Sequence, residues 1–282
     1  LSQGLVFGRA LPQYDRVTLM KYFDAHCHIQ FDAYSEDREE LVGRMQQEEV
    51  CGIVVGTGLA SSRSAIALIE GTDDMYAAVG LHPNHTGEET FEYDAFLALA
   101  KHPKVVAIGE CGLDNFRPGD VEAAKPLQRE VFRKHIELAL EVDKPLMIHG
   151  RPSKGTMDAY EDIISILSEF KETHGEKLRG DIHFFVGTPE VAARFVALGF
   201  TLSFTAVITF ARDYDEVIRS VPLTSILSET DSPYVAPASR RGQRNDPISA
   251  KDVIASIASI RGEDEETVRK TVLGNAKRLF AL

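Results

Sequence analysis

The stretch Tyr22-Phe23-Asp24-Ala25-His26-Cys27-His28 is a short, mostly apolar run that ends in two histidines one residue apart. Side chains alternate in direction along a β-strand, so His26 and His28 are expected on one face and Cys27 on the other. Two imidazoles that converge at a strand end form half of a metal site. This stretch therefore predicts the first strand of the fold and the place where its chemistry collects.

Seven more β-rich apolar runs follow, and longer amphipathic stretches separate them. The eight predicted strands span residues 22–28, 51–56, 75–80, 105–109, 145–149, 181–185, 200–204 and 225–229. Helices are predicted at residues 36–48, 63–70, 90–100, 127–142, 157–172, 189–198, 214–220, 249–260 and 264–280. Short apolar strands that alternate with helices predict a parallel α/β sheet buried on both faces, and eight such units favour closure into a (β/α)8 TIM barrel. A doubly wound open sheet is the alternative.

The length of 282 residues suits a single barrel domain, and the 44% of apolar residues allow a large core. No apolar run approaches the roughly 20 residues that a membrane helix needs. Residues 1–19 lack the apolar segment of a signal peptide and precede the patterned sequence. We interpret them as an N-terminal extension, natural or left by cloning, and residues 20–282 as one barrel domain.

Cysteine content and charge indicate the setting in which the chain works. Cys27, Cys51 and Cys111 form no C-x-x-C pair, which predicts a reducing, cytoplasmic location without a disulfide framework. The net charge of −12 gives the chain no general attraction to the phosphates of nucleic acids. Bound divalent ions would reverse that locally, because they are often the largest charges in a site.

Histidines and carboxylates recur where the predicted strands end. They lie at or near the ends of six of the eight strands: His26 and His28, His82, Glu110 and Asp114, His149, His183, and Glu229 with Asp231. Each has an ordinary explanation alone, such as a hydrogen-bonded pair or a turn residue. Because the carboxyl ends of barrel strands meet at one face, the whole set favours a metal site there. We interpret the histidines at positions 85, 102, 135 and 174 as solvated.

Several motifs resemble those of the TatD family of metal-dependent deoxyribonucleases, within the amidohydrolase-like barrel superfamily. The matching segments are Phe23–His28, Val79–Pro83, Ala107–Asp114, Pro145–His149, Glu229–Tyr234, Arg244–Pro247 and Asn275–Phe280. Two segments depart from the family pattern: His183-Phe184-Phe185-Val186-Gly187 replaces His-Cys-Phe-(Ser/Thr)-Gly, and Asn245-Asp246-Pro247 replaces Asn-Glu-Pro. Both changes are expected to alter substrate preference more than metal binding.

The resemblance implies two divalent metal ions, Mg²⁺, Mn²⁺ or Zn²⁺, among which the ligand types do not decide. One ion would be held by His26, His28, Glu110 and Asp231. The other would be held by Glu110, His149 and His183, with Glu110 bridging the two. The implied catalytic residues are Glu110 and Asp231, and we expect Asp231 to orient or deprotonate the attacking water.

Basic side chains near the predicted mouth are candidates for phosphate binding. We predict substrate contacts from His82, Arg151, Arg244 and Asn245, because a guanidinium fork fits phosphate geometry. Arg240, Arg241 and Arg244 form a basic cluster in the loop after the last strand, for which a solvated loop is the alternative.

The expected function is hydrolysis of phosphodiester bonds in DNA, single-stranded or at 3′ ends, by a TatD-like 3′–5′ exonuclease. The first alternative is an amidohydrolase of a small amide, lactone or phosphotriester. Many such relatives carry a carboxylated Lys at the fourth-strand position, where this chain has Glu110. The second alternative is a non-catalytic metal-binding protein, which six convergent ligands disfavour because structural sites usually have four. No membrane partner is expected, and nothing in the sequence indicates an oligomer.

Overall fold

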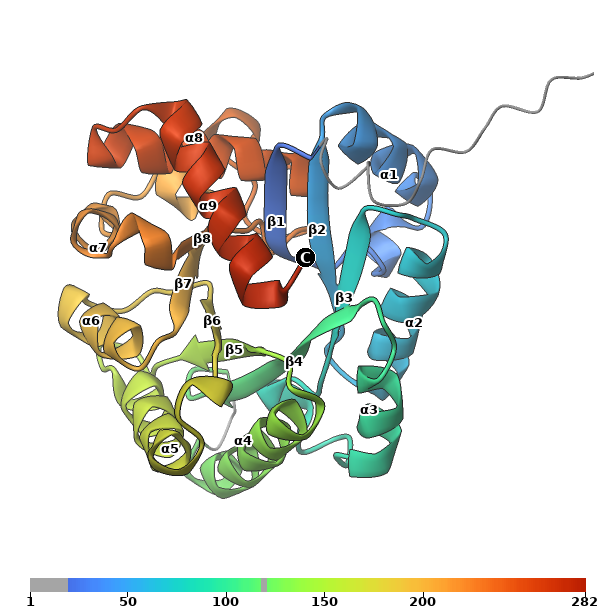
Figure 1. Cartoon of the computed structure of the whole chain (residues 1–282), viewed down its shortest axis with the longest axis vertical. Coiled ribbons are helices and arrows are strands. Elements are labelled where there is room, and N and C mark those ends of the chain that lie inside the picture. Colours follow the sequence, from blue (N-terminus) through green and yellow to red (C-terminus); the bar gives the residue numbers. More distant parts are fainter. Residues whose placement is uncertain (1–19, 118–120) are drawn as a thin grey trace, which may run out of the picture.

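Eight parallel strands lie side by side in chain order in the computed structural model, which describes residues 20–117 and 121–282 (Figure 1). They are β1 (Tyr22–Cys27), β2 (Val50–Val55), β3 (Met75–Val79), β4 (Val105–Asp114), β5 (Leu146–Arg151), β6 (Gly180–His183), β7 (Thr201–Phe204) and β8 (Ile226–Ser228). The ring closes where Cys27 pairs with Ser232 and the Asp231 N–H donates to the His26 carbonyl at 2.9 Å. The predicted TIM barrel is confirmed, and closure excludes the open sheet.

Helices surround the strands (Figure 1). They are α1 (Arg38–Gln47), α2 (Leu59–Glu70), α3 (Tyr93–Ala100), α4 (Val121–Val142), α5 (Asp158–His174), α6 (Pro189–Ala197), α7 (Asp215–Ser220), α8 (Ala250–Arg261) and α9 (Glu265–Phe280). The apolar faces of the strands and helices form the main core, with large fully buried side chains such as Phe96, Phe132 and Phe195. None of the helices in the described ranges is both long enough and apolar enough to cross a membrane.

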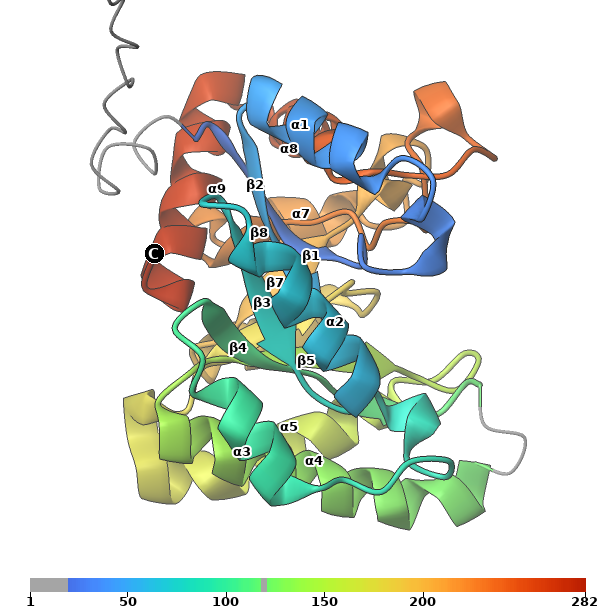
Figure 2. The ribbon, with the colours of Figure 1, turned by 90° about the vertical axis from the view of Figure 1, so that its right-hand side faces the viewer.

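Helix α9 covers the amino-terminal end of the barrel. Phe280 stacks on Phe23 with ring centroids 6.0 Å apart, and Ala276 and Leu279 are buried in the same cluster as Ile53 and Val55 of β2. Figure 2 shows α9 at one end of the molecule and the loops after the strands at the other. The opposite, carboxyl-terminal end is therefore the end at which a site can open to solvent.

Strand β4 is five residues longer than predicted. Gly109 and Gly112 have φ values of 155° and 128°, which favour glycine, and an added Cβ on Gly112 would lie 2.1 Å from the His149 carbonyl oxygen of β5. These glycines let β4 continue past Glu110 while lying close against β5. The strand therefore carries both Glu110 and Asp114 toward the open end.

Helix α4 starts six residues before its predicted beginning at residue 127. Pro126 lies inside it. At the sixth position of the helix it leaves one backbone carbonyl of the preceding turn without its helical N–H partner.

The three cysteines are free and buried, as expected for packing residues. Burial raises the pKa of the Cys27 and Cys111 thiols well above the ordinary value, which makes them poor nucleophiles.

Candidate metal centre

Two histidines of β1 meet a carboxylate of β4 at the open end of the barrel. The Nε2 atoms of His26 and His28 lie 3.0 Å apart. Oε2 of Glu110 lies 3.6 Å from the first and 3.8 Å from the second. All three side chains are almost fully buried. Asp231, which follows β8, adds an oxygen 3.5 Å from His28 Nε2 and 3.9 Å from His26 Nε2.

The second oxygen of Glu110 faces a different group of imidazoles. Oε1 lies 3.1 Å from His149 Nδ1, 3.3 Å from His82 Nε2 and 3.7 Å from His183 Nε2. Glu110 therefore stands between the β1 pair and the histidines from β5 and β6. The structure brings the other five predicted ligands together around this one carboxylate.

The hydrogen bonds of His28 and His183 indicate that these side chains suit a cation. His28 Nδ1 lies 2.8 Å from the Val55 carbonyl oxygen, which can only accept, so Nδ1 carries the proton. The Nε2 lone pair of neutral His28 then points toward the Glu110 and Asp231 carboxylates. His183 repeats the pattern, since its Nδ1 donates to Glu229 at 2.6 Å while Nε2 faces Glu110. A lone pair directed at a carboxylate is unfavourable unless a proton or a metal ion lies between them, so the donor set fits a metal ion.

The pKa values reflect the same concentration of charge. Burial alone would raise the pKa of Glu110, but the surrounding imidazoles, His82 first, hold it well below its usual range. Burial lowers the pKa of His183, but the charge and hydrogen bond of Glu229 outweigh it and raise this pKa to about 10. Protons and metal ions would therefore compete for the nitrogen atoms of these histidines, because either supplies the positive charge that the buried carboxylates require.

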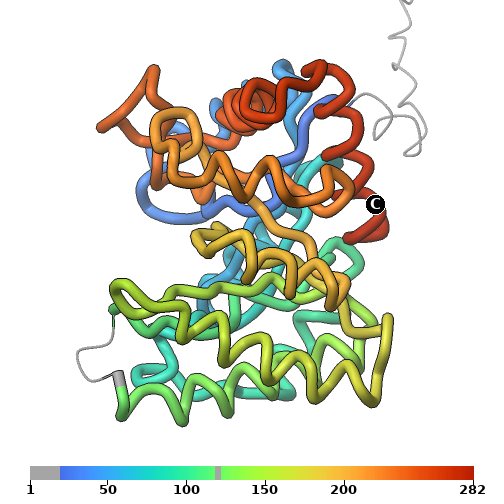
Figure 3. The backbone as a smooth tube through the Cα atoms, turned by 90° about the vertical axis from the view of Figure 1, so that its left-hand side faces the viewer, coloured from blue at the N-terminus to red at the C-terminus, as the bar shows by residue number. Residues whose placement is uncertain are grey.

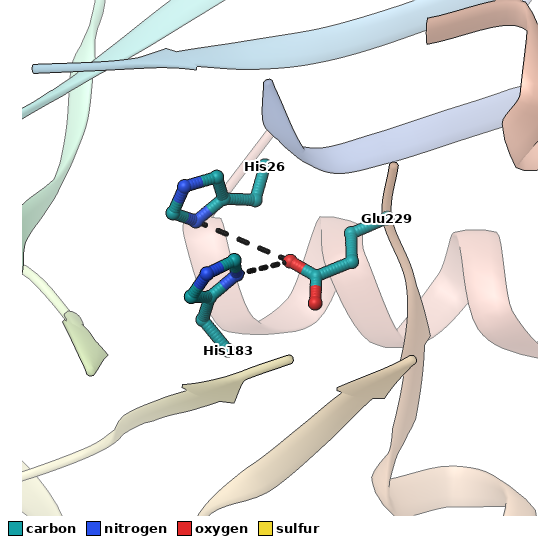
Figure 4. Close-up of side chains that lie close together, drawn as sticks. All are labelled: His26, His183 and Glu229. Atoms are coloured by element: carbon teal, nitrogen blue, oxygen red, sulfur yellow. Dashed lines mark hydrogen bonds and ion pairs between the residues drawn. The ribbon is translucent and has the colours of Figure 1, made fainter. Parts of the chain in front are cut away.

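Glu229 is a part of the centre that the sequence prediction did not assign (Figure 4). Its fully buried carboxylate accepts hydrogen bonds from His183 Nδ1 and from the Phe184 N–H, both at 2.6 Å. The same oxygen that faces His183 lies 4.0 Å from His26 Nδ1, and the two imidazole rings stack with centroids 3.5 Å apart. Glu229 thus holds His183 directly and lies beside His26, whose Nδ1 has no hydrogen-bond partner among the described residues.

Asp114 does the same for His149. Its Oδ2 lies 3.1 Å from His149 Nε2, which leaves His149 Nδ1 for Glu110 and the centre. Asp114 also accepts hydrogen bonds from the Asn84 side chain and from the main chain at Phe116 and Arg117. The available sequence signal for both carboxylates was their position at strand ends, beside the predicted ligands.

His82 differs from the other histidines in the tautomer that its contacts require. Its Nδ1 accepts a hydrogen bond from the Asn84 N–H at 3.1 Å, so the proton of the neutral ring is on Nε2. Burial lowers the pKa of His82, which favours that neutral form. Nε2 faces Glu110 as a donor, which suits a hydrogen bond to an oxygen better than metal ligation.

An open cleft of about 1270 Å³ lies over the centre. Its floor includes Glu110, His149 and Asp231, and its walls include Arg117 and Arg151. The predicted contact residues His82 and Arg151 thus lie where a substrate would be bound. The Arg151 guanidinium carbon lies 4.3 Å from the centroid of the Phe116 ring.

Two of the predicted substrate contacts, Arg244 and Asn245, lie in the loop after β8 and have structural partners. Arg244 pairs with Asp37 and lies over the Tyr34 ring at 4.5 Å. Asn245 is fully buried, and its side chain bonds to the carbonyls of Thr230 and Val235 and to Ser249. Among the described residues, neither lines the cleft. Their polar groups hold the loop in place, and neither side chain is positioned to contact a substrate in the cleft.

The other arginines of the predicted basic cluster also have structural partners. Arg240 pairs with Asp246 at 2.9 Å, and Arg241 lies over the Phe210 ring at 4.2 Å. The interpretation of His135 as solvated is wrong as well, because it is completely buried in α4. Its Nδ1 donates to the Val131 carbonyl, and its Nε2 accepts from the Leu81 N–H at 2.9 Å.

Comparisons with known proteins agree with the motifs. The family model described as TatD related DNase matches residues 23–281. An uncharacterized metal-dependent hydrolase of Bacillus subtilis, YabD, is 39% identical over 92% of this chain and 99% of its own length. An uncharacterized metal-dependent hydrolase TatD of Mycobacterium tuberculosis is 33% identical over 92% of this chain and 97% of its own. The crystal structure of YjjV, a TatD homologue from Escherichia coli, superposes with a TM-score of 0.82, at 29% identity over 94% of this chain and 99% of its own.

Proposed function

Since this chain belongs to the family of TatD-related DNases and is a metal-dependent hydrolase, we propose that it hydrolyses phosphodiester bonds of DNA. The observation that carries this proposal is the position of Glu110, whose two oxygens face separate groups of imidazoles on the cleft floor. A bridging carboxylate of this kind suits a pair of divalent ions, and two-metal sites are common in nucleases and phosphatases.

We assign the ligands as the resemblance implies. His26, His28, Glu110 and Asp231 would hold one ion, and Glu110, His149 and His183 the other. Bound there, divalent ions lower the pKa of a water molecule and neutralise charge that develops on a phosphoryl oxygen.

The protein supplies the orientation of the reactants. Burial would raise the pKa of Asp231, but the neighbouring imidazoles, His28 first, lower it, so the carboxylate stays ionised. In this form it accepts a hydrogen bond from the attacking water and aims it at phosphorus. The Nε2–H of His82 and the guanidinium groups of Arg117 and Arg151 donate to phosphate oxygens from the cleft wall.

We propose that the substrate is a DNA strand, single-stranded or at a 3′ end, and that cleavage proceeds from 3′ to 5′. The test combines metal analysis of the purified protein with digestion of oligonucleotides labelled at the 3′ or the 5′ end, with Mg²⁺, Mn²⁺ or Zn²⁺ added. Hydrolysis of amides, lactones or phosphotriesters in place of DNA would contradict the proposal. So would metal binding that raises the melting temperature without any hydrolysis.

Glu110→Gln and Asp231→Asn are expected to lower DNA hydrolysis by about a hundredfold or more, because each removes a charged group from the reacting centre. The melting temperature of both variants should show that the fold survives. Glu161→Gln is the matched control, since Glu161 pairs with Arg194 on the outer helices. Turnover like that of the wild type in either cleft variant would refute the assignment.

A further inference from the structure

Large exposed apolar side chains in the described ranges gather around the cleft. Tyr234 is 54% exposed, Phe116 51% and Leu127 39%. Tyr234 and Leu127 line the cleft directly. Phe116 lies against Arg151 and immediately precedes Arg117, and both of these arginines line it. Exposed apolar groups that collect at one concave site indicate that something covers them in use.

These side chains stand on opposite walls. Phe116 and Leu127 belong to the segment that follows β4, and Tyr234 belongs to the segment that follows β8. In a closed ring of eight strands in chain order, β4 and β8 are four places apart, so they are diametrically opposed. Figures 2 and 3 show the segments after β4 and β8 at opposite sides of the same end of the barrel.

The centre lies between the two walls. Glu110 and Asp231 are on the cleft floor, and the two cations, Arg117 and Arg151, are on the wall that carries Phe116. A chain that crosses from one wall to the other therefore meets an apolar surface, then the carboxylates and imidazoles of the centre, then a second apolar surface. A DNA strand has this alternation, with a flat base on each side of every phosphodiester.

We propose that Tyr234 on one wall, and Phe116 with Leu127 on the other, are two stacking sites that hold the unpaired bases on either side of the scissile phosphate. This assignment rests on the proposed function and deepens it. Stacking on aromatic side chains tolerates any base, because every base has a π face. Paired bases within a duplex keep their faces covered, so these sites admit only unpaired nucleotides.

The experiment combines base removal with residue removal. Oligonucleotides carry one abasic unit immediately 5′ or immediately 3′ of the cleaved bond, and kcat/KM is measured with metal for the wild type, Tyr234→Ala and Phe116→Ala. Loss of one stacked base should lower kcat/KM of the wild type by about 5- to 150-fold. Tyr234→Ala should cause a similar loss on intact DNA and no further loss when the abasic unit occupies the position that Tyr234 holds. Phe116→Ala should show the same pattern at the other position.

Controls separate stacking from a general loss of structure. Tyr234→Phe keeps the ring and should restore activity and sensitivity to the abasic unit. Tyr93→Ala truncates an aromatic ring on α3, where Tyr93 bonds to Glu141, and should leave the response to abasic DNA unchanged. Melting temperatures show whether each variant is folded.

Each result decides a different claim. If the wild type cleaves intact and abasic DNA at the same rate, the stacking sites are refuted and the proposed function stands. If the wild type cleaves neither DNA with any metal, the proposed function falls and the stacking sites fall with it. If Tyr234→Ala lowers self-association or partner binding but leaves the abasic response unchanged, the exposed ring is a protein contact and our proposal is wrong.

Discussion

A hydrogen bond on one nitrogen of an imidazole decides what the other nitrogen can bind. The carboxylate of Glu229 fixes the proton of His183 on Nδ1, and the Val55 carbonyl does the same for His28. In their neutral forms both rings then present Nε2 lone pairs to the centre. His82 has the opposite arrangement, because a main-chain N–H occupies its Nδ1. Three histidines within one centre thus have two different chemical roles.

Glu229→Gln is expected to weaken binding of the metal ion that His183 ligates by about 10- to 100-fold. The carboxylate accepts from His183 and from the Phe184 N–H, whereas an amide has a single acceptor oxygen. Titration of the metal-free protein with Mn²⁺ or Zn²⁺ measures the affinity directly. Glu172→Gln on the exposed surface of α5 is the control. Equal affinities of Glu229→Gln and the wild type would show that Glu229 does not support the site.

The sequence identifies residues by type and by distance from a strand end, and it predicts less well what each side chain touches. The six expected ligands stand out because the barrel brings strand ends together. Arg244 and Asn245 lie in the loop after β8 too, but Arg244 pairs with Asp37, and the Asn245 side chain bonds back to the Thr230 carbonyl. His135 looks like a surface residue until the fold places its Nε2 against the Leu81 N–H. Such partners become visible only in three dimensions.

At the scale of the element, β4 supplies the central carboxylate of the site. It carries Glu110 and Asp114, and its residues 108 and 111–114 pair with residues 146 and 148–151 of β5. The strand predicted from the sequence ends at Gly109, and glycines usually weaken a strand. Here the two glycines allow the backbone of β5 to approach β4 closely. The β-strand propensity of a single residue does not reveal such a contact between strands.

Gly112→Ala is expected to lower the free energy of unfolding by about 2–6 kcal/mol. The positive φ and the overlap of an added Cβ with the His149 carbonyl both oppose the native backbone. Gly43→Ala is the matched control, because nothing lies within 4 Å of its added Cβ in helix α1. That change should stabilise the protein by about 0.5–1 kcal/mol. Urea unfolding measures both, and equal stabilities would contradict the close approach of β4 and β5.

His135 ties α4 to the segment after β3 and makes this contact sensitive to acid. Burial lowers the pKa of His135 from 6.5 to about 4. Between these values the unfolded chain binds a proton that the folded protein does not, so stability falls as the pH falls from 6.5 toward 4. The loss is about 1.4 kcal/mol per pH unit, up to about 3 kcal/mol.

His135→Gln should therefore reduce the slope of unfolding free energy against pH by about one proton in this range. Urea unfolding in EDTA at several pH values measures the slope. His174→Gln removes an exposed histidine and should leave the slope close to that of the wild type. An unchanged slope in His135→Gln would show that His135 is not a buried neutral group.

The whole molecule is acidic, because 43 Asp and Glu residues outnumber 31 Lys and Arg residues, and its net charge of −12 opposes the approach of a polyanion. The arginines of the loop after β8 pair with Asp37 and Asp246 or lie over aromatic rings. Arg117 and Arg151 remain at the cleft. Affinity for the proposed DNA substrate should thus depend on the centre and the cleft walls more than on long-range attraction.

We expect a shallow dependence of DNA affinity on salt. Two arginine–phosphate contacts on single-stranded DNA predict a slope of about −1.4 for log(1/KM) against log[NaCl]. Arg151→Gln should reduce the steepness by about 0.7, whereas Arg244→Gln should leave it unchanged. Measurements of KM from 50 to 300 mM NaCl, at fixed metal concentration, give the slopes. A larger effect of Arg244→Gln would restore this residue as a substrate contact.

Helix α9 closes the amino-terminal end of the barrel, and this determines how the molecule can be attached to a surface. Leu282 follows α9 at the closed end, and the mouth faces the other way (Figure 2). A tether attached after Leu282 would fix the protein to a bead or a surface with its opening directed outward. If the proposed function is correct, the anchored protein should cleave long DNA strands in a flow cell as freely as it does in solution.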